Sequence, residues 1–162
     1  MDVTLPLRIF SVDPATGKSG WALLEVTSLI PLSITILQTG LLDGDKLLRQ
    51  KKDMSKTFQR QYCILDALEE EYTNLLTEHQ PDAIVSEGAF AYVHISAALA
   101  LTLAINVLRR CAHKVLHKDI TTVPPTITKM AFAGKGNADK DQMRTAYLSA
   151  PFLIPDTAND EI

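Results

Sequence analysis

The first clear strand of this chain is LRIFSVDP, residues 7–14. Its apolar, β-rich run ends at Asp13, and Pro14 stops regular pairing there. A carboxylate at the tip of a buried strand costs free energy unless it is paired or bound to a cation. The stretch therefore predicts the first strand of a sheet and a candidate site at its end. A turn or helix-capping role for Asp13 is the alternative.

The segments that follow predict a mixed sheet. A turn at residues 15–18 leads into strands at 19–26 and 33–41, and together with the first strand these make an antiparallel meander. Apolar residues at helical spacing predict a helix over 58–79, and a fourth strand follows at 83–86. An antiparallel hairpin sheet that continues through helix-connected strands is typical of α/β folds.

The second half of the chain continues this alternation. The expected elements are an apolar helix over 94–112, a fifth strand over 114–117 and 120–123, short helices over 126–132 and 139–149, and a last helix starting at Asp156 or Thr157. The sequence thus predicts one α/β domain over residues 1–162, with a mixed five-stranded sheet flanked by helices.

Composition narrows the class of protein. The chain has 162 residues, of which 46% are apolar and 22% charged, as in an ordinary globular domain. Its longest apolar stretch, residues 95–108, includes Ser96, Thr102 and Asn106, and is expected to be a buried helix rather than a membrane span. No secretory signal is evident, so Cys63 and Cys111 are expected to be reduced core thiols in an intracellular protein, cytoplasmic or nucleoid-associated.

Charge is unevenly distributed. Residues 1–108 carry 8 basic and 13 acidic side chains, whereas residues 109–144 carry 8 basic and 3 acidic ones. The final 18 residues add three acids, Asp156, Asp160 and Glu161. A basic stretch beside acidic ones suits a phosphate-binding surface next to carboxylates that hold cations, although a simple solvated face has the same pattern.

A second acid stands at the tip of a second apolar strand, because Glu87 directly follows Ile84-Val85-Ser86. Strand tips are where α/β sheets build their sites. Two carboxylates in this position, with further acids near the C-terminal end, favour a shared site for Mg²⁺ or Mn²⁺ rather than Zn²⁺, because the ligands are all oxygens.

At this point a family resemblance becomes visible. IFSVDP (9–14) followed by Gly20-Trp21-Ala22 resembles the opening strand and hairpin of RuvC-type Holliday junction resolvases, nucleases of ribonuclease-H-like fold, with Ala15 in place of their usual glycine. PDAIVSEGAF (81–90) resembles the segment with the family's second acid. Lys129 with GKGNADKDQM (134–143) resembles its basic loop, and ANDEI (158–162) the start of its last acidic helix.

The resemblance implies hydrolysis of a phosphodiester bond with two Mg²⁺ ions, or Mn²⁺ as a substitute. Asp13, Glu87 and Asp160 would be catalytic metal ligands, and Lys140 would stabilise charge on the phosphate, an exposed first-turn lysine being the alternative. The family's second helical acid would fall just after Ile162, so either the sequence is expected to be truncated there or Asp156 replaces that acid.

The resemblance also implies DNA contacts. Phe90 matches an aromatic residue that the family inserts against bases, although packing on the helix at Ile95 is an open alternative. The candidate DNA-binding residues are Phe90, Tyr92, Lys118, Lys129, Lys135 and Lys140.

A four-way junction has two symmetric cleavage positions, so a homodimer is expected, with the helix over 94–112 as its interface. The expected function is a structure-specific endonuclease that resolves four-way DNA junctions. Another ribonuclease-H-like or branched-DNA nuclease would use the same acids, and a non-catalytic junction-binding protein also stays open. A sugar or nucleotide kinase of related fold is excluded because it needs a second domain of similar size.

Overall fold

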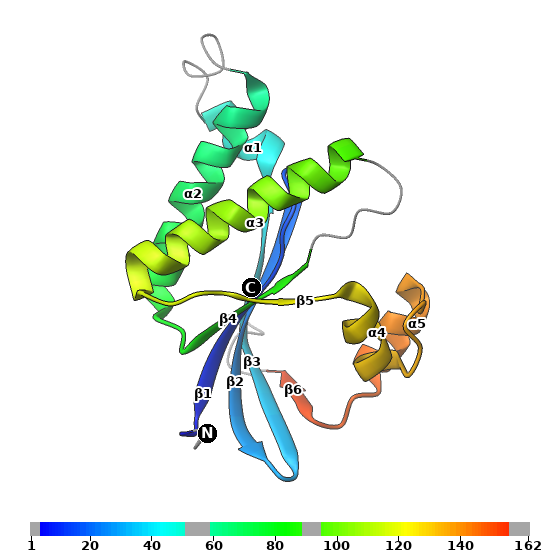
Figure 1. Cartoon of the computed structure of the whole chain (residues 1–162). Helices are drawn as coiled ribbons and strands as arrows, with labels where there is room; N and C mark the ends of the chain where they lie inside the picture. The colour runs from blue at the N-terminus through cyan, green and yellow to red at the C-terminus, as the bar shows by residue number, and fades with distance from the viewer. Residues whose placement is uncertain (1–3, 51–58, 89–94, 156–162) are drawn as a thin grey trace.

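The computed structural model describes residues 4–50, 59–88 and 95–155 (Figure 1). Its strands are β1 (Leu7–Asp13), β2 (Lys18–Leu29), β3 (Leu32–Asp43), β4 (Ala83–Glu87), β5 (Thr121–Val123) and β6 (Leu153–Pro155). Its helices are α1 (Gly44–Gln50), α2 (Arg60–His79), α3 (Ile95–Leu116), α4 (Pro125–Ala133) and α5 (Lys140–Leu148). The strands form one mixed sheet in the order β5-β4-β1-β2-β3-β6, whose β1, β4 and β5 run parallel.

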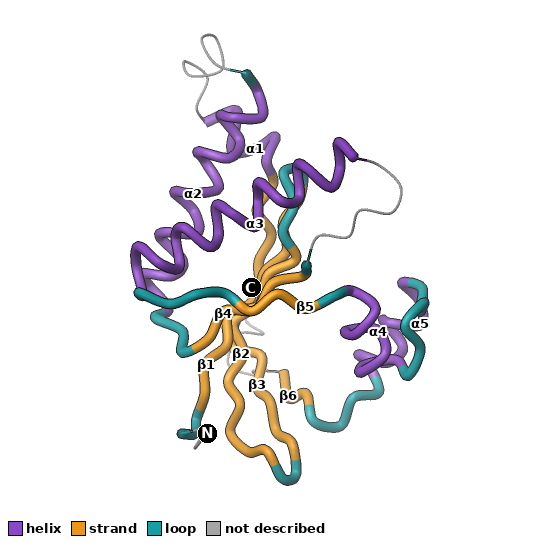
Figure 2. The backbone as a smooth tube through the Cα atoms, in the orientation of Figure 1, coloured by secondary structure: helices purple, strands orange, loops and turns teal. Residues whose placement is uncertain are grey.

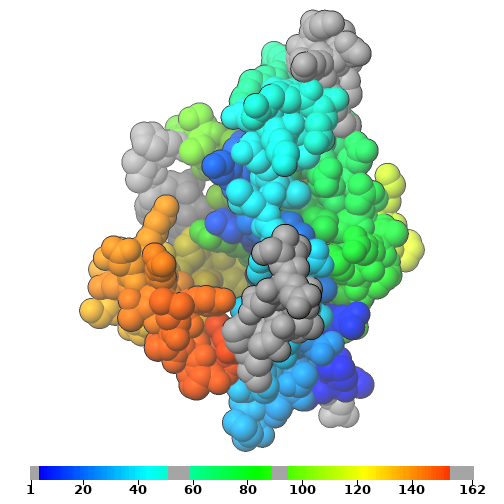
Figure 3. Space-filling model, turned by 180° about the vertical axis from the view of Figure 1, so that it is seen from behind, coloured from blue at the N-terminus to red at the C-terminus, as the bar shows by residue number. Residues whose placement is uncertain are grey.

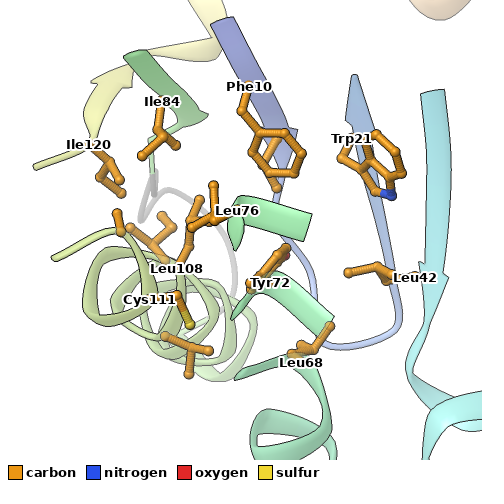
Figure 4. Close-up of a cluster of buried hydrophobic side chains, with 14 of the residues drawn as sticks. Phe10, Trp21, Leu42, Leu68, Tyr72, Leu76, Ile84, Leu108, Cys111 and Ile120 are labelled. Atoms are coloured by element: carbon orange, nitrogen blue, oxygen red, sulfur yellow. The ribbon is translucent and has the colours of Figure 1, made fainter. Parts of the chain in front are cut away.

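The two faces of this sheet differ because side chains alternate along each strand. Phe10 of β1 and Ile84 of β4 are buried on the face that α2 and α3 cover, where they lie near Leu76 and Leu108 (Figure 4). Burying such side chains contributes about 1.5–3 kcal/mol each. The odd-numbered residues of β1 and β4 point to the other face, so the helix-covered core fixes which way the strand tips present their side chains.

The mixed α/β sheet predicted from the sequence is confirmed: the first four expected strands are present, and of the expected fifth strand the segment at 120–123 is present as β5. The described chain adds a short sixth strand, β6, which pairs parallel to β3 and ends at a proline that hides its strand pattern. It also adds α1, in which the Asp43 carboxylate accepts hydrogen bonds from the backbone N–H groups of Asp45 and Lys46 at 3.0 and 3.1 Å. This is the usual signature of a helix start, so the sequence did carry a signal for α1.

Helix α3 is longer than predicted. The expected strand at residues 114–117 is wrong, because α3 continues to Leu116, where Val115 and Leu116 still pack on the core at helical spacing. His117 then ends the helix with a positive φ of 54°. At 22 residues, α3 is long and apolar enough to cross a membrane. The length argument made from the 14-residue apolar stretch at 95–108 therefore does not hold for the whole helix. Its second half, from Ala104 to Ala112, nevertheless contributes six buried residues to the folded core.

Helices α4 and α5 form a hairpin beside the sheet, where Figure 2 shows them following β5 and Figure 3 shows the surface of α5 from behind. Neither helix contains a buried residue. Instead, Asp139 caps the N-terminus of α5 through a reciprocal pair of hydrogen bonds with Gln142. The ring of Phe132 packs edge-on against that of Phe152, with the ring centroids 5.9 Å apart. The two predicted helices are thus confirmed, while the last helix expected from Asp156 lies outside the described residues.

Candidate active site

Asp13 and Glu87 lie side by side at the same edge of the sheet. In the parallel β1–β4 ladder Val12 is opposite Ser86, so the next residues, Asp13 and Glu87, are neighbours on strands about 4.8 Å apart. Neighbours in register point to the same face, which here is the face away from α2 and α3. The sequence prediction that these two acids share one site is therefore consistent with the strand register.

The register of these strands is fixed at their opposite ends. The backbone N–H of Arg8 donates to the carboxylate of Asp82 at 2.9 Å, and the N–H of Asp82 donates to the carbonyl of Arg8 at 2.9 Å. At the site end, the N–H of Gly88 donates to the carbonyl of Val123 on β5 at 2.9 Å. A slip of one residue would turn each acid to the other face, so these bonds protect the site.

The electrostatics at Glu87 are those of an acid held beside another acid. Burial of this half-buried carboxyl is the main cause that raises its pKa above the usual value, and the negative charge of Asp13 raises it further. The ammonium group of Lys129 acts in the opposite direction and lowers the pKa. The pKa of Glu87 is therefore influenced by the negative charge of Asp13 and by the positive charge of Lys129. Such an environment is expected where a bound divalent cation would relieve the repulsion between the two carboxylates.

The turn after Asp13 is held tightly by α1. The N–H of Gly44 donates to the carbonyl of Gly17 at 2.7 Å, and a Cβ at position 44 would lie 2.1 Å from the carbonyl oxygen of Thr16. Only glycine allows this approach. The start of α1, which sequence reasoning missed, therefore fixes the loop that follows β1.

Two buried hydroxyls beneath Asp13 were also missed. Ser19 Oγ donates to the backbone carbonyl of Asp13 at 3.1 Å, and it lies 2.7 Å from the hydroxyl of Tyr72 on α2. Both residues are fully buried. Their only signal in the sequence was a serine on the inward face of an apolar strand and a tyrosine inside an apolar helix stripe.

The four candidate lysines occupy different places. Lys129 of α4 is half-buried and close enough to Glu87 to shift its pKa. Lys135 lines a hollow of about 590 Å³ between α4 and α5, and Lys140 is exposed at the first position of α5. Lys118 lies elsewhere: its ammonium donates to the carbonyl of Pro81 at 3.0 Å, before the start of β4 and at the opposite end of that strand from Glu87.

Several predicted site residues lie outside the described residues: Phe90 and Tyr92 after β4, and Asp156, Asp160 and Glu161 near the C-terminal end. Within residues 4–50, 59–88 and 95–155, no group of three or more His, Cys, Asp or Glu side chains is arranged to hold a metal ion. The described part of the site thus supplies two carboxylates. That pair fits one side of a site for a hard divalent cation, which takes oxygen ligands and retains several waters.

Comparison with known proteins gives consistent similarities. No family model matches the chain. It is 26% identical to a crossover junction endodeoxyribonuclease RuvC of Hydrogenovibrio crunogenus, over 85% of this chain and 70% of the relative. It is 29% identical to a RuvC of Porphyromonas gingivalis, over 91% of this chain and 70% of the relative.

Among solved structures, the fold resembles Thermus thermophilus RuvC in complex with a Holliday junction substrate, with a TM-score of 0.68 at 16% identity over 86% of this chain and 76% of that one. It also resembles the yeast mitochondrial Holliday junction resolvase Ydc2, with a TM-score of 0.67 at 11% identity over 98% of this chain and 68% of that one. At these identities the structural matches establish the fold, and the sequence matches point to the same group of proteins.

Proposed function

Because the chain is a divergent relative of the RuvC-type resolvases, we propose that it is a structure-specific endonuclease that resolves four-way DNA junctions by hydrolysis of a phosphodiester bond. The observation that carries the proposal is the register of β1 and β4, which sets Asp13 beside Glu87 on the open face of the sheet. A purely structural role does not explain this like-charge pair.

The site is proposed to take Mg²⁺, with Mn²⁺ as a substitute and two ions per site. Asp13 and Glu87 would hold the ions, with Asp160 and, less centrally, Asp156 contributing from the C-terminal segment. The negative charge of Asp13 raises the pKa of Glu87, so a shared cation would stabilise the pair by replacing their repulsion with two attractions. Bound there, divalent ions supply an activated water and stabilise the leaving oxygen.

The chain's own cations are proposed to position the DNA. The charge of Lys129 lowers the pKa of Glu87, so its ammonium is proposed to hold a phosphate oxygen at the cleavage position. Lys135 and Lys140 lie farther along the α4–α5 hairpin and are proposed to follow the phosphate backbone away from that position, Lys140 being the further candidate for the scissile phosphate. Lys118, bound to Pro81 at the far end of β4, would contact DNA only at a distance from the cut.

A homodimer is proposed, with α3 at its interface. Ile95 and Leu99 in the first half of α3 are 90% and 58% exposed, and Tyr62 of α2 is 66% exposed. Ile95, Leu99 and Leu103 follow one another at intervals of four residues and so lie along one face of α3. Leu103 also lines, with Tyr62, a hollow of about 410 Å³ between the two helices. Such a surface is costly in water and suits a second copy related by two-fold symmetry.

The dimer proposal predicts that Leu99→Lys converts the protein to a monomer without unfolding it, because the substituted side chain is already exposed. Light scattering at micromolar concentration would read the mass, with circular dichroism as the folding control. A parent protein that is itself monomeric under these conditions would contradict the dimer.

The protein is also proposed to act in the cytoplasm, at the nucleoid, because its proposed substrate is cellular or viral DNA.

The proposed function is tested by offering the purified chain a synthetic four-way junction, a replication-fork analogue and a linear duplex of matched sequence, each in Mg²⁺, Mn²⁺ and EDTA. We expect cleavage of the junction at least about 100-fold faster than the duplex, and only with a divalent ion. Equal cutting of all three substrates would indicate a general nuclease instead. Tight junction binding without cleavage would indicate a non-catalytic junction-binding protein.

A further inference from the structure

A chain of buried hydrogen bonds runs from helix α2 to the backbone of Asp13. Ser19 Oγ lies 3.1 Å from the Asp13 carbonyl oxygen and 2.7 Å from the Tyr72 hydroxyl. A serine hydroxyl has one proton, and the carbonyl can only accept, so that proton points to Asp13. The Tyr72 hydroxyl must then donate to Ser19, which gives the chain a single direction, from Tyr72 through Ser19 to Asp13.

Burial makes this chain rigid. Ser19 and Tyr72 are both 0% exposed, and Figure 4 shows Tyr72 among the apolar side chains between the sheet and α2. Burial, its largest cause, raises the pKa of Tyr72 to about 12, so its hydroxyl keeps its proton at any working pH. A buried hydroxyl without a partner is costly, so each member holds the next in place.

The chain ends at the position that the proposed chemistry needs to fix. On one side of the Asp13 backbone is the Ser19 hydroxyl, and beyond Pro14 the turn is clamped by Gly44 against Thr16 and Gly17. Asp13 itself is exposed, so its side chain has no packing of its own to set its direction. Its direction therefore depends on the backbone, which is held by the pairing of Asp13 with Gly20 of β2 and by the Ser19 hydroxyl.

We infer that Tyr72 and Ser19 are positioning residues for Asp13: through the carbonyl at the tip of β1 they hold the Asp13 carboxylate toward the Glu87 side for binding of a divalent cation. The inference rests on the proposed function for its role in cleavage, but not for its role in metal binding. Groups that orient a metal ligand without touching the metal commonly change affinity or rate by about 10–100-fold when removed.

The test uses Tyr72→Phe, which removes the hydroxyl and keeps the ring, and Thr73→Val as a matched control. Thr73 is the next residue of α2, and its hydroxyl contacts the Cys111 sulfur at 3.6 Å rather than the β1 tip. Both changes remove one hydroxyl from neighbouring positions of one helix. Comparing them therefore separates the Asp13 connection from a general loosening of the core.

Mn²⁺ binding by the full chain is measured by electron paramagnetic resonance, together with thermal unfolding and single-turnover junction cleavage at saturating enzyme. We expect Tyr72→Phe to weaken Mn²⁺ binding by about 10-fold, to slow cleavage, and to regain most of its rate at high Mn²⁺, while junction affinity stays within about twofold. Thr73→Val is expected to bind Mn²⁺ and cleave like the parent even if its Tm falls as far.

Ser19→Ala alone would leave the Tyr72 hydroxyl buried without a partner and could unfold the protein. The double variant Tyr72→Phe/Ser19→Ala is used instead, because it removes both hydroxyl groups together. We expect this double variant to fold and to bind Mn²⁺ no more tightly than Tyr72→Phe. Parent-like Mn²⁺ affinity in either folded variant would overturn the inference. A parent that binds Mn²⁺ yet cuts no junction would contradict the proposed function, and the Mn²⁺ comparison would still decide the positioning role.

Discussion

The acidic and basic halves of the candidate site are built in different ways. Asp13 and Glu87 stand at the tips of strands in the middle of the sheet, above a core that includes Phe10 and Ile84 at 0% and 1% exposure. The cations stand on α4 and α5, which contain no buried residue. The difference teaches that the carboxylates proposed for the chemistry are fixed by the core, whereas the lysines of the α4–α5 hairpin, proposed to contact the DNA backbone, are carried at the surface.

The largest expected effect on cleavage comes from substituting Glu87, in the acidic half of the candidate site. Glu87→Gln keeps the size of the side chain and removes the charge that a divalent ion needs, so we expect junction cleavage to fall by about 1000-fold or more. Junction binding in EDTA should stay close to that of the parent, since the proposed phosphate contacts are lysines and not Glu87. Rates from single-turnover assays and affinities from gel shifts would check this. A variant that still cleaves within about 10-fold of the parent would remove Glu87 from the site.

An intermediate effect is expected within the basic half, and it sharpens the comparison. The charge of Lys129 lowers the pKa of Glu87, whereas Lys118 is hydrogen-bonded to Pro81 at the other end of β4. Lys129→Ala should slow cleavage by about 10–100-fold, because a cation beside the scissile phosphate is lost. Lys118→Ala should change the rate by less than about threefold. Equal losses in both variants would show that the lysines act only through net charge.

The smallest effect concerns stability and has a defined pH dependence. Burial, and then the charge of Asp13, raise the pKa of Glu87 above its usual 4.5, so the folded chain holds this proton more tightly than the unfolded chain does. Stability is therefore lost as the pH rises from the unfolded pKa through the folded one.

Glu87→Gln should accordingly raise Tm in EDTA at pH 8, by about 1–2 °C because water screens a half-exposed group, and the gain should vanish near pH 4. Differential scanning calorimetry at both pH values would measure it. Saturating Mg²⁺ should reverse the order, since the ion stabilises only the parent. A variant less stable than the parent in EDTA at pH 8 would mean that burial and the charge of Asp13 do not destabilise the ionised Glu87 carboxylate.

The parts of the fold that could be predicted from the sequence are those with a regular pattern. In β1, β4 and the long helices, apolar residues recur at the spacing of a strand or a helix because one face is buried. An acid that directly follows such an apolar strand breaks the pattern and is therefore easy to recognise. The end of α3 was misread because residues 114–117 are as compatible with a strand as with a helix. Packing of Val115 and Leu116 on the core decides for the helix, and a sequence pattern does not contain that contact.

The pairing of Asp13 with Glu87 at one edge of the sheet could be predicted from the sequence, because acids that directly follow apolar strands are visible in it, whereas the roles of the lysines stay predictions. The supporting residues could not be predicted. Ser19 and Tyr72 are 53 positions apart, and only the packing of α2 under β2 makes them partners. Gly44 is likewise unremarkable in the sequence until the Thr16 turn lies against it. Phe90, Tyr92, Asp156 and Asp160 lie outside the described residues, so their roles stay predictions.

The central claim is that the Asp13–Glu87 pair forms a metal-dependent site that cuts four-way junctions, and mapping the cut positions tests it most directly. Each strand of an end-labelled four-way junction is analysed after incubation in Mg²⁺ with the parent or with Asp13→Asn. The account predicts paired nicks at symmetric positions in two opposing strands, made by the parent and absent with Asp13→Asn, which should still bind the junction. Unchanged nicks with Asp13→Asn, or cuts scattered equally along a linear duplex, would contradict it.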